Sequence, residues 1–171
     1  MPTLIALAGL PGVGKTSIAR ALALRTGAVF LRIDAIEAAM LRSRPGAEIG
    51  GESYAIACAL AVTNLAVGSD VICDCVNPWA LTRALFRAAA DEAGARFLGV
   101  EVLCADRALH RQRLEARQDD LPGFVAADWA AVEARDYHPW EEADLRLDTA
   151  ALSAEEAAVR IAARLAPGLS G

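Results

Sequence analysis

The sequence predicts an α/β fold in which a parallel sheet is covered by helices on both faces. Two observations support this prediction. Strand-like and helix-like segments alternate along the chain, and each strand-like segment is a nearly continuous run of apolar residues. The sequence shows no repeat, linker or low-complexity segment, so we expect a single domain over residues 1–171.

The first expected strand, residues 3–8, leads into the stretch GLPGVGKT at residues 9–16, which fits the phosphate-binding pattern G-x-x-x-x-G-K-[ST]. A helical pattern follows and ends at Gly27, so the motif has the strand, loop and helix context that it requires. Backbone N–H groups of such a loop surround phosphate oxygens; Lys15, the only lysine of the chain, would neutralise phosphate charge, and Thr16 would bind Mg²⁺. We therefore expect a nucleoside triphosphate to contact Gly9, Pro11, Gly12, Val13, Gly14, Lys15, Thr16 and Ser17.

The alternation continues to the end of the chain. The helix expected at residues 54–67 is apolar all round, which predicts that it packs on more than one side. Residues 118–128 begin with polar, turn-forming residues and are expected to form a lid, and Ser153-Ala154-Glu155-Glu156 predicts a capping box. Further strands are expected at residues 28–34, 70–74, 95–103 and 144–148, and further helices at 35–42, 77–93, 106–117, 128–135 and 153–165.

Two of the expected strands end on an acid, Asp34 and Asp74, at the edge of the sheet where such folds bind ligands. Asp74 follows an apolar run and suits Mg²⁺, bound directly or through water; it could instead be a turn residue or a helix cap. Asp34 could position or deprotonate a nucleophile, act as a helix N-cap, or do both. Together with the phosphate loop, these acids predict phosphoryl transfer.

Arg113 and Arg117 lie four residues apart, on one face of a helix that ends beside the expected lid. Such arginines can belong to an ordinary solvated surface. Their place after the fourth strand instead favours contact with the nucleotide.

Composition and charge narrow the choice of partner. Hydrophobic residues make up 55% of the chain and charged residues 23%, which excludes a disordered protein. The net charge of -5 and the absence of a basic stripe argue against a nucleic-acid partner. No apolar run reaches membrane-spanning length and no charged leader precedes the first strand, so we expect a cytoplasmic protein with a small-molecule substrate.

These motifs together resemble the small P-loop kinases of the adenylate-kinase-like group. The resemblance covers almost the whole chain and rests on the phosphate loop, Asp34, the run from Val71 to Asp74, the Arg113–Arg117 pair and residues 141–149. It is strongest to AAA-type predicted kinases and chloramphenicol phosphotransferase-like proteins, and weaker to shikimate, gluconate and adenylylsulfate kinases.

The resemblance implies a five-stranded parallel sheet of order 2-3-1-4-5, with ATP over the first loop and the acceptor between the second and third strand ends. It gives Asp34 the role of base, places Arg113 against adenine and Arg117 against the phosphates, and brings Thr149 near the adenine edge. Many relatives carry arginines in the lid where this chain has Asp119 and Asp120, so Arg135 could substitute for them. The catalytic residues are then Lys15, Asp34 and Arg117, and the metal ligands Thr16 and Asp74.

The sequence thus predicts an ATP- and Mg²⁺-dependent enzyme, monomeric or homodimeric, that phosphorylates a hydroxyl group of a small molecule. Two alternatives stay open: a toxin-like kinase acting on a nucleotide sugar, and a nucleotide-binding ATPase or switch without such an acceptor. A GTPase would need an N-K-x-D run, which a chain with one lysine in its phosphate loop cannot contain. The acceptor is expected to meet Asp34, Arg42, Tyr54, Asn77, Arg83 and Arg135.

Overall fold

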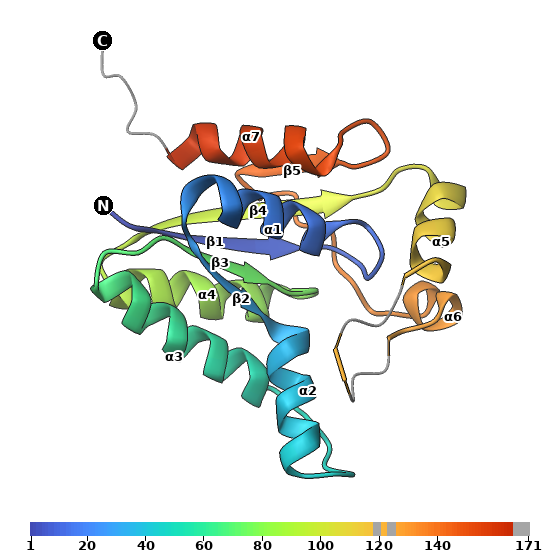
Figure 1. Ribbon diagram of the computed structural model, residues 1–171, viewed down its shortest axis with the longest axis horizontal. Coiled ribbons are helices and arrows are strands. Elements are labelled where there is room, and N and C mark those ends of the chain that lie inside the picture. Colours follow the sequence, from blue (N-terminus) through green and yellow to red (C-terminus); the bar gives the residue numbers. More distant parts are fainter. Residues whose placement is uncertain (118–120, 123–125, 166–171) are drawn as a thin grey trace.

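Five parallel strands form one sheet in the order β2-β3-β1-β4-β5 (Figure 1), as the resemblance implied. This computed structural model describes residues 1–117, 121–122 and 126–165. Within those ranges no helix is both long enough and apolar enough to cross a membrane. The strands are β1 (Thr3–Ala8), β2 (Val29–Arg32), β3 (Val71–Asp74), β4 (Arg96–Leu103) and β5 (Leu145–Asp148).

Helices cover both faces of the sheet, and shorter helices stand at its carboxyl edge (Figure 1). α1 (Lys15–Thr26) and α7 (Ala154–Leu165) pack on one face, and α3 (Glu52–Ala66) and α4 (Ala80–Glu92) on the other. α2 (Ile33–Ser43), α5 (Arg107–Glu115) and α6 (Trp129–Glu133) lie at the end to which the strands point.

The central strand β1 supplies both halves of the core. All six of its residues are buried. Successive side chains of a strand point to opposite faces, so Ile5 and Leu7 join the core under α1 and α7, while Leu4 and Ala6 join the core under α3 and α4. The predicted class, a sheet buried on both faces, is confirmed.

The second strand ends earlier than its apolar run predicts. Strand β2 stops at Arg32, and Ile33, which is buried in the core, already belongs to α2. Asp34 therefore lies inside the first turn of this helix, and the N-cap position is held by Arg32. The interpretation of Asp34 as an N-cap is wrong, because the helix already begins at Ile33, one residue before it.

The prediction that the apolar third helix packs on more than one side is also wrong. The buried side chains of α3 form one stripe of Ser53, Ala57, Ala61 and Leu65, spaced four residues apart. Ile56 and Leu60, on another side of the helix, are 40% and 42% exposed. Apolar composition did not reveal which side faces the sheet, because small alanines occur on every side of this helix.

Three other boundaries differ from the predicted ones. The helix expected from Asn77 begins at Ala80, because Asn77 has a positive φ of 49° that a helix does not allow. The helix expected through Arg117 ends at Glu115. Asp128 caps a shorter α6, and the Ser153 capping box forms with Glu156 as predicted. Of the expected lid, residues 118–120 and 123–125 lie outside the described residues.

Candidate active site

A cavity of about 1020 Å³ opens at the carboxyl edge of the sheet. Its volume is at the upper end of the range for small-molecule sites, roughly 300–1,000 Å³. Most of the predicted site residues line it: Pro11, Gly12, Gly14, Lys15, Thr16, Ser17, Asp34, Tyr54, Asp74, Arg113, Arg117, Arg135 and Thr149.

The loop between β1 and α1 owes its shape to glycines. Gly9, Gly12 and Gly14 all have positive φ values, of 142°, 86° and 102°. At Gly9 a Cβ atom would lie 2.2 Å from the backbone oxygen of Val102, so no larger residue fits without a shift of β4. The resulting loop leaves the start of α1 facing the cavity, where its free N–H groups and helix dipole favour an anion.

Lys15 lies across this loop. Its Nζ donates a hydrogen bond to the Leu10 carbonyl at 2.9 Å, and the side chain is only 7% exposed. Burial lowers the pKa of Lys15, and the nearby carboxylates of Asp74 and Asp34 oppose that shift. The ammonium group is thus held where it faces both the loop and the two acids.

Thr16 and Asp74 form a hydrogen-bonded pair beside the loop. The Thr16 hydroxyl donates to Asp74 Oδ2 at 2.7 Å. Burial raises the pKa of Asp74, while Lys15 and Thr16 act in the opposite direction. A hydroxyl and a carboxylate oxygen are the ligands that Mg²⁺ prefers, so the pair fits this ion. Asp74 does not cap α4, whose N-cap is Trp79.

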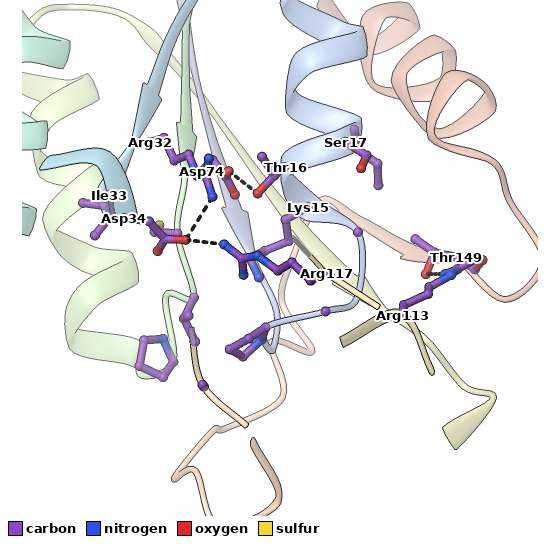
Figure 2. Close-up of a pocket in the computed structure, with 18 of the residues that line it drawn as sticks. Lys15, Thr16, Ser17, Arg32, Ile33, Asp34, Asp74, Arg113, Arg117 and Thr149 are labelled. Atoms are coloured by element: carbon purple, nitrogen blue, oxygen red, sulfur yellow. Dashed lines mark hydrogen bonds and ion pairs between the residues drawn. The ribbon is translucent and has the colours of Figure 1, made fainter. Parts of the chain in front are cut away.

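Asp34 faces the same cavity from α2 and meets two arginines (Figure 2). Its Oδ2 lies 3.4 Å from Arg117 and 3.5 Å from Arg32. Its place at the N-terminus of α2 also stabilises a negative charge. Asp34 therefore presents a carboxylate oxygen to the cavity.

On the far side of the loop, Arg113 holds the turn after β5. Its guanidinium donates to the hydroxyl and to the carbonyl of Thr149, at 2.9 and 3.1 Å. The Thr149 hydroxyl in turn donates to the Val13 carbonyl at 2.8 Å. These bonds fix α5, the phosphate loop and the β5 turn to one another.

The remaining predicted residues do not line the cavity. Gly9 and Val13 belong to the loop but do not line the cavity, and Val13 is buried in the core. Arg42 donates to the Pro122 carbonyl at 2.8 Å, and Asn77 is fully buried. Arg83 donates to the carbonyls of Asn77, Pro78, His138 and Pro139.

The structure also brings in residues that sequence reasoning missed. Arg32 and Glu37 line the cavity, Arg32 at the end of β2 and Glu37 one helical turn after Asp34. The spacing of Asp34 and Glu37 would have indicated a shared helix face. His110, buried on α5, has its Nε2 2.8 Å from the Pro11 carbonyl, so this nitrogen donates to the loop. No sequence signal distinguishes it from a surface histidine.

Comparison with known proteins finds one matching family model and a set of solved structures that share the fold. A family model described as an AAA domain matches residues 4–135. No curated protein matches the chain.

Three solved structures illustrate the fold. The APS kinase CysC of Mycobacterium tuberculosis, solved with AMPPNP and APS, is 24% identical, with a TM-score of 0.67 over 96% of this chain and 97% of that chain. A gluconokinase of Sinorhizobium meliloti is 22% identical, with a TM-score of 0.64 over 96% and 94% of the two chains. The tunicamycin resistance protein of Deinococcus radiodurans is 20% identical, with a TM-score of 0.65 over 97% and 96%.

Proposed function

Because the chain belongs to the AAA domain family and shares the fold of P-loop kinases, we propose that it is an ATP- and Mg²⁺-dependent phosphotransferase with a small-molecule alcohol as acceptor. One observation carries the proposal. The phosphate loop, the Thr16–Asp74 pair and the Asp34 carboxylate all face one cavity, which therefore offers a phosphate site, a metal site and a base together.

The loop side of the cavity is the donor site. Loop N–H groups and Lys15 bind the β- and γ-phosphates, and Arg117 adds positive charge where negative charge develops during transfer. Arg113 and Thr149 border the adenine. The APS kinase with the same fold was solved with AMPPNP, an ATP analogue, which supports ATP as the donor.

Thr16 and Asp74 would hold Mg²⁺. When bound, the ion neutralises charge on the β- and γ-phosphate oxygens. The hydroxyl of Thr16 and the carboxylate of Asp74 already lie 2.7 Å apart, so little rearrangement is needed to bring both to one ion.

The α2 side of the cavity is the acceptor site. Asp34 accepts the proton of the acceptor hydroxyl, whose oxygen forms the new bond to the γ-phosphorus while the bond to the β–γ bridging oxygen breaks and ADP leaves. Tyr54 and Arg135 line this side and are candidates for acceptor contacts. Arg83 makes only structural contacts in this arrangement, since its guanidinium is occupied by backbone carbonyls.

A chemical footprint tests the donor site without knowledge of the acceptor. The chain has one lysine, Lys15, and we expect Mg-ATP to protect its amine from acylating reagents. Adenosine, which has no phosphates for the loop to bind, is the control and should not protect Lys15. Equal labelling of Lys15 with and without Mg-ATP, read by peptide mass spectrometry, would contradict the donor site.

Turnover tests the reaction itself. ADP and phosphorylated product should form from Mg-ATP with a member of a panel of sugars, sugar acids, nucleosides, nucleotide sugars and hydroxylated antibiotics. Lys15→Ala should lower kcat by about 10²-fold or more, and Asp34→Asn by roughly 10²–10⁴-fold. Free phosphate as the only product, with every acceptor, would instead favour an ATPase.

A further inference from the structure

The carboxylate of Asp34 is shared by two arginines that differ in how firmly they are held (Figure 2). Arg32 ends strand β2, where it pairs in register with Asp74 of β3, and its side chain is 7% exposed. Arg117 follows the C-cap of α5, outside any helix or strand, and its side chain is 24% exposed. Arg32 is therefore built into the sheet, whereas Arg117 lies outside any regular element and has the more exposed side chain.

Arg117 also stands within electrostatic reach of the phosphate loop. Figure 2 draws the Arg117 guanidinium next to the side chain of Lys15, and the two charges are close enough to interact. Both arginines and Lys15 line the same cavity. A triphosphate carries several negative charges, so it attracts a nearby guanidinium more strongly than one carboxylate does.

We propose that Asp34 and the phosphates of the nucleotide compete for Arg117, and that Arg32 is the positioning residue that keeps Asp34 directed into the cavity once Arg117 has turned away. The proposal rests on the donor site described above. It assigns Arg117 two alternative partners and gives Arg32 a role that no motif in the sequence indicates.

This exchange has a direct chemical effect. With two guanidinium groups beside it, Oδ2 of Asp34 is already occupied by ion-pair partners. When Arg117 binds phosphate instead, Oδ2 is released to accept the proton of the acceptor hydroxyl. Nucleotide binding thereby activates the residue that serves the second substrate.

A double-mutant cycle measures the competition without any acceptor. The dissociation constant of Mg-AMPPNP is determined by calorimetry for wild type, Asp34→Asn, Arg117→Ala and the double variant. Asp34→Asn should tighten binding about two- to fivefold, the size expected for a partly exposed ion pair, because Arg117 is no longer held. In the Arg117→Ala background the same change should have little effect.

Simple loss of a negative charge would tighten binding in both backgrounds by the same factor, and that result would overturn the proposal. Glu115→Gln is the matched control, since it removes a carboxylate two residues from Arg117 that is paired with Arg111 and does not line the cavity. It should leave the dissociation constant unchanged.

Arg32 is tested by rescue. Arg32→Gln leaves Asp34 paired with Arg117, so Mg-AMPPNP binding should weaken. Adding Asp34→Asn should restore binding when Arg117 is present, and should not restore it in a variant that also carries Arg117→Ala. Arg32→Lys keeps the positive charge and should stay near wild type. Weakening that Asp34→Asn fails to reverse would mean that Arg32 acts only on the fold.

The two levels of proposal fail in different ways. If wild type does not bind Mg-AMPPNP, both the proposed function and the competition for Arg117 are contradicted. If wild type binds Mg-AMPPNP but the cycle shows no coupling between Asp34 and Arg117, only the competition falls.

Discussion

The hydroxyl of Thr149 sits between segments that are far apart in the sequence. It accepts a hydrogen bond from Arg113, and its own proton goes to the Val13 carbonyl at 2.8 Å, with the Leu103 carbonyl 3.2 Å away. The residue is 5% exposed, so water cannot easily replace these partners. One side chain thus holds the phosphate loop against the end of the sheet.

Thr149→Val should therefore loosen the loop at constant side-chain volume. The change leaves the Val13 carbonyl without its donor, and we expect a loss of about 1–3 kcal/mol in the free energy of unfolding and weaker Mg-AMPPNP binding. Thr149→Ser keeps the hydroxyl and should retain most of the stability and most of the affinity for Mg-AMPPNP. The two variants are compared by urea unfolding and calorimetry; equal behaviour would show that the hydroxyl is dispensable.

At the scale of single residues, most of the cavity-lining residues that the sequence predicted are those that obey a motif. The loop, Lys15 and Thr16 have a fixed spacing, and Asp74 follows an apolar run. Arg32 and His110 could not be predicted in the same way, because their partners lie on other elements and are brought close only by the fold. Arg83 was expected at the acceptor but is used to hold backbone carbonyls, a role that leaves no pattern along the chain.

Between elements, the close contact of the phosphate loop with β4 depends on Gly9. Gly9→Ala would place a methyl group 2.2 Å from the Val102 oxygen at a φ of 142°, so we expect it to destabilise the fold by about 2–4 kcal/mol. Gly27→Ala is the control: Gly27 also has a positive φ, of 74°, but nothing lies within 4 Å of the added Cβ. Thermal unfolding should show a clearly larger loss for Gly9→Ala, and equal losses would contradict the contact argument.

The join between β4 and the segment before β5 depends on Glu101. Burial would raise the pKa of this carboxyl, but hydrogen bonds from the Trp140 backbone, Arg146 and Tyr137 outweigh it and lower the pKa below its usual value. An acid with a lowered pKa in the folded state adds stability above its ordinary pKa of about 4.3. That stability is lost as the pH falls through the lowered value.

Glu101→Gln should therefore reduce the free energy of unfolding by about 1–3 kcal/mol at neutral pH. It should also flatten the decline of stability below about pH 5. Glu115→Gln, which breaks an exposed ion pair with Arg111, should change neither. The free energy of unfolding is measured by urea unfolding across the acid range. If it falls with pH as steeply in Glu101→Gln as in wild type, Glu101 is not the source of the decline.

At the scale of elements, the sequence predicted which helices and strands exist better than it predicted where they begin and end. Every predicted strand and helix within the described residues is present, because alternation of apolar runs and helical patterns reflects the two buried faces of the sheet. The end of β2 was missed because Ile33 stays apolar whether it continues a strand or starts a helix. The side on which α3 packs depends on its neighbours and not on its composition.

For the molecule as a whole, the cavity is lined by residues from Pro11 to Ala154. A ligand there contacts segments from nearly the entire chain, so its binding energy should appear as stability of the complete fold. At about 100 times its dissociation constant, Mg-AMPPNP should add about 2.7 kcal/mol and raise Tm by about 5–10 °C. Lys15→Ala should abolish most of the shift, and an unchanged Tm in wild type would contradict binding.

The hydrogen bond from Thr149 to Val13 spans 136 positions in the sequence. During synthesis the phosphate loop leaves the ribosome well before the strand and turn that fasten it. A nascent chain that lacks β5 has the complete motif but not the partner that closes the loop. The ability to retain nucleotide should therefore appear only after β5 has been synthesised, which makes it a reporter of the docking of the β5 turn on the phosphate loop.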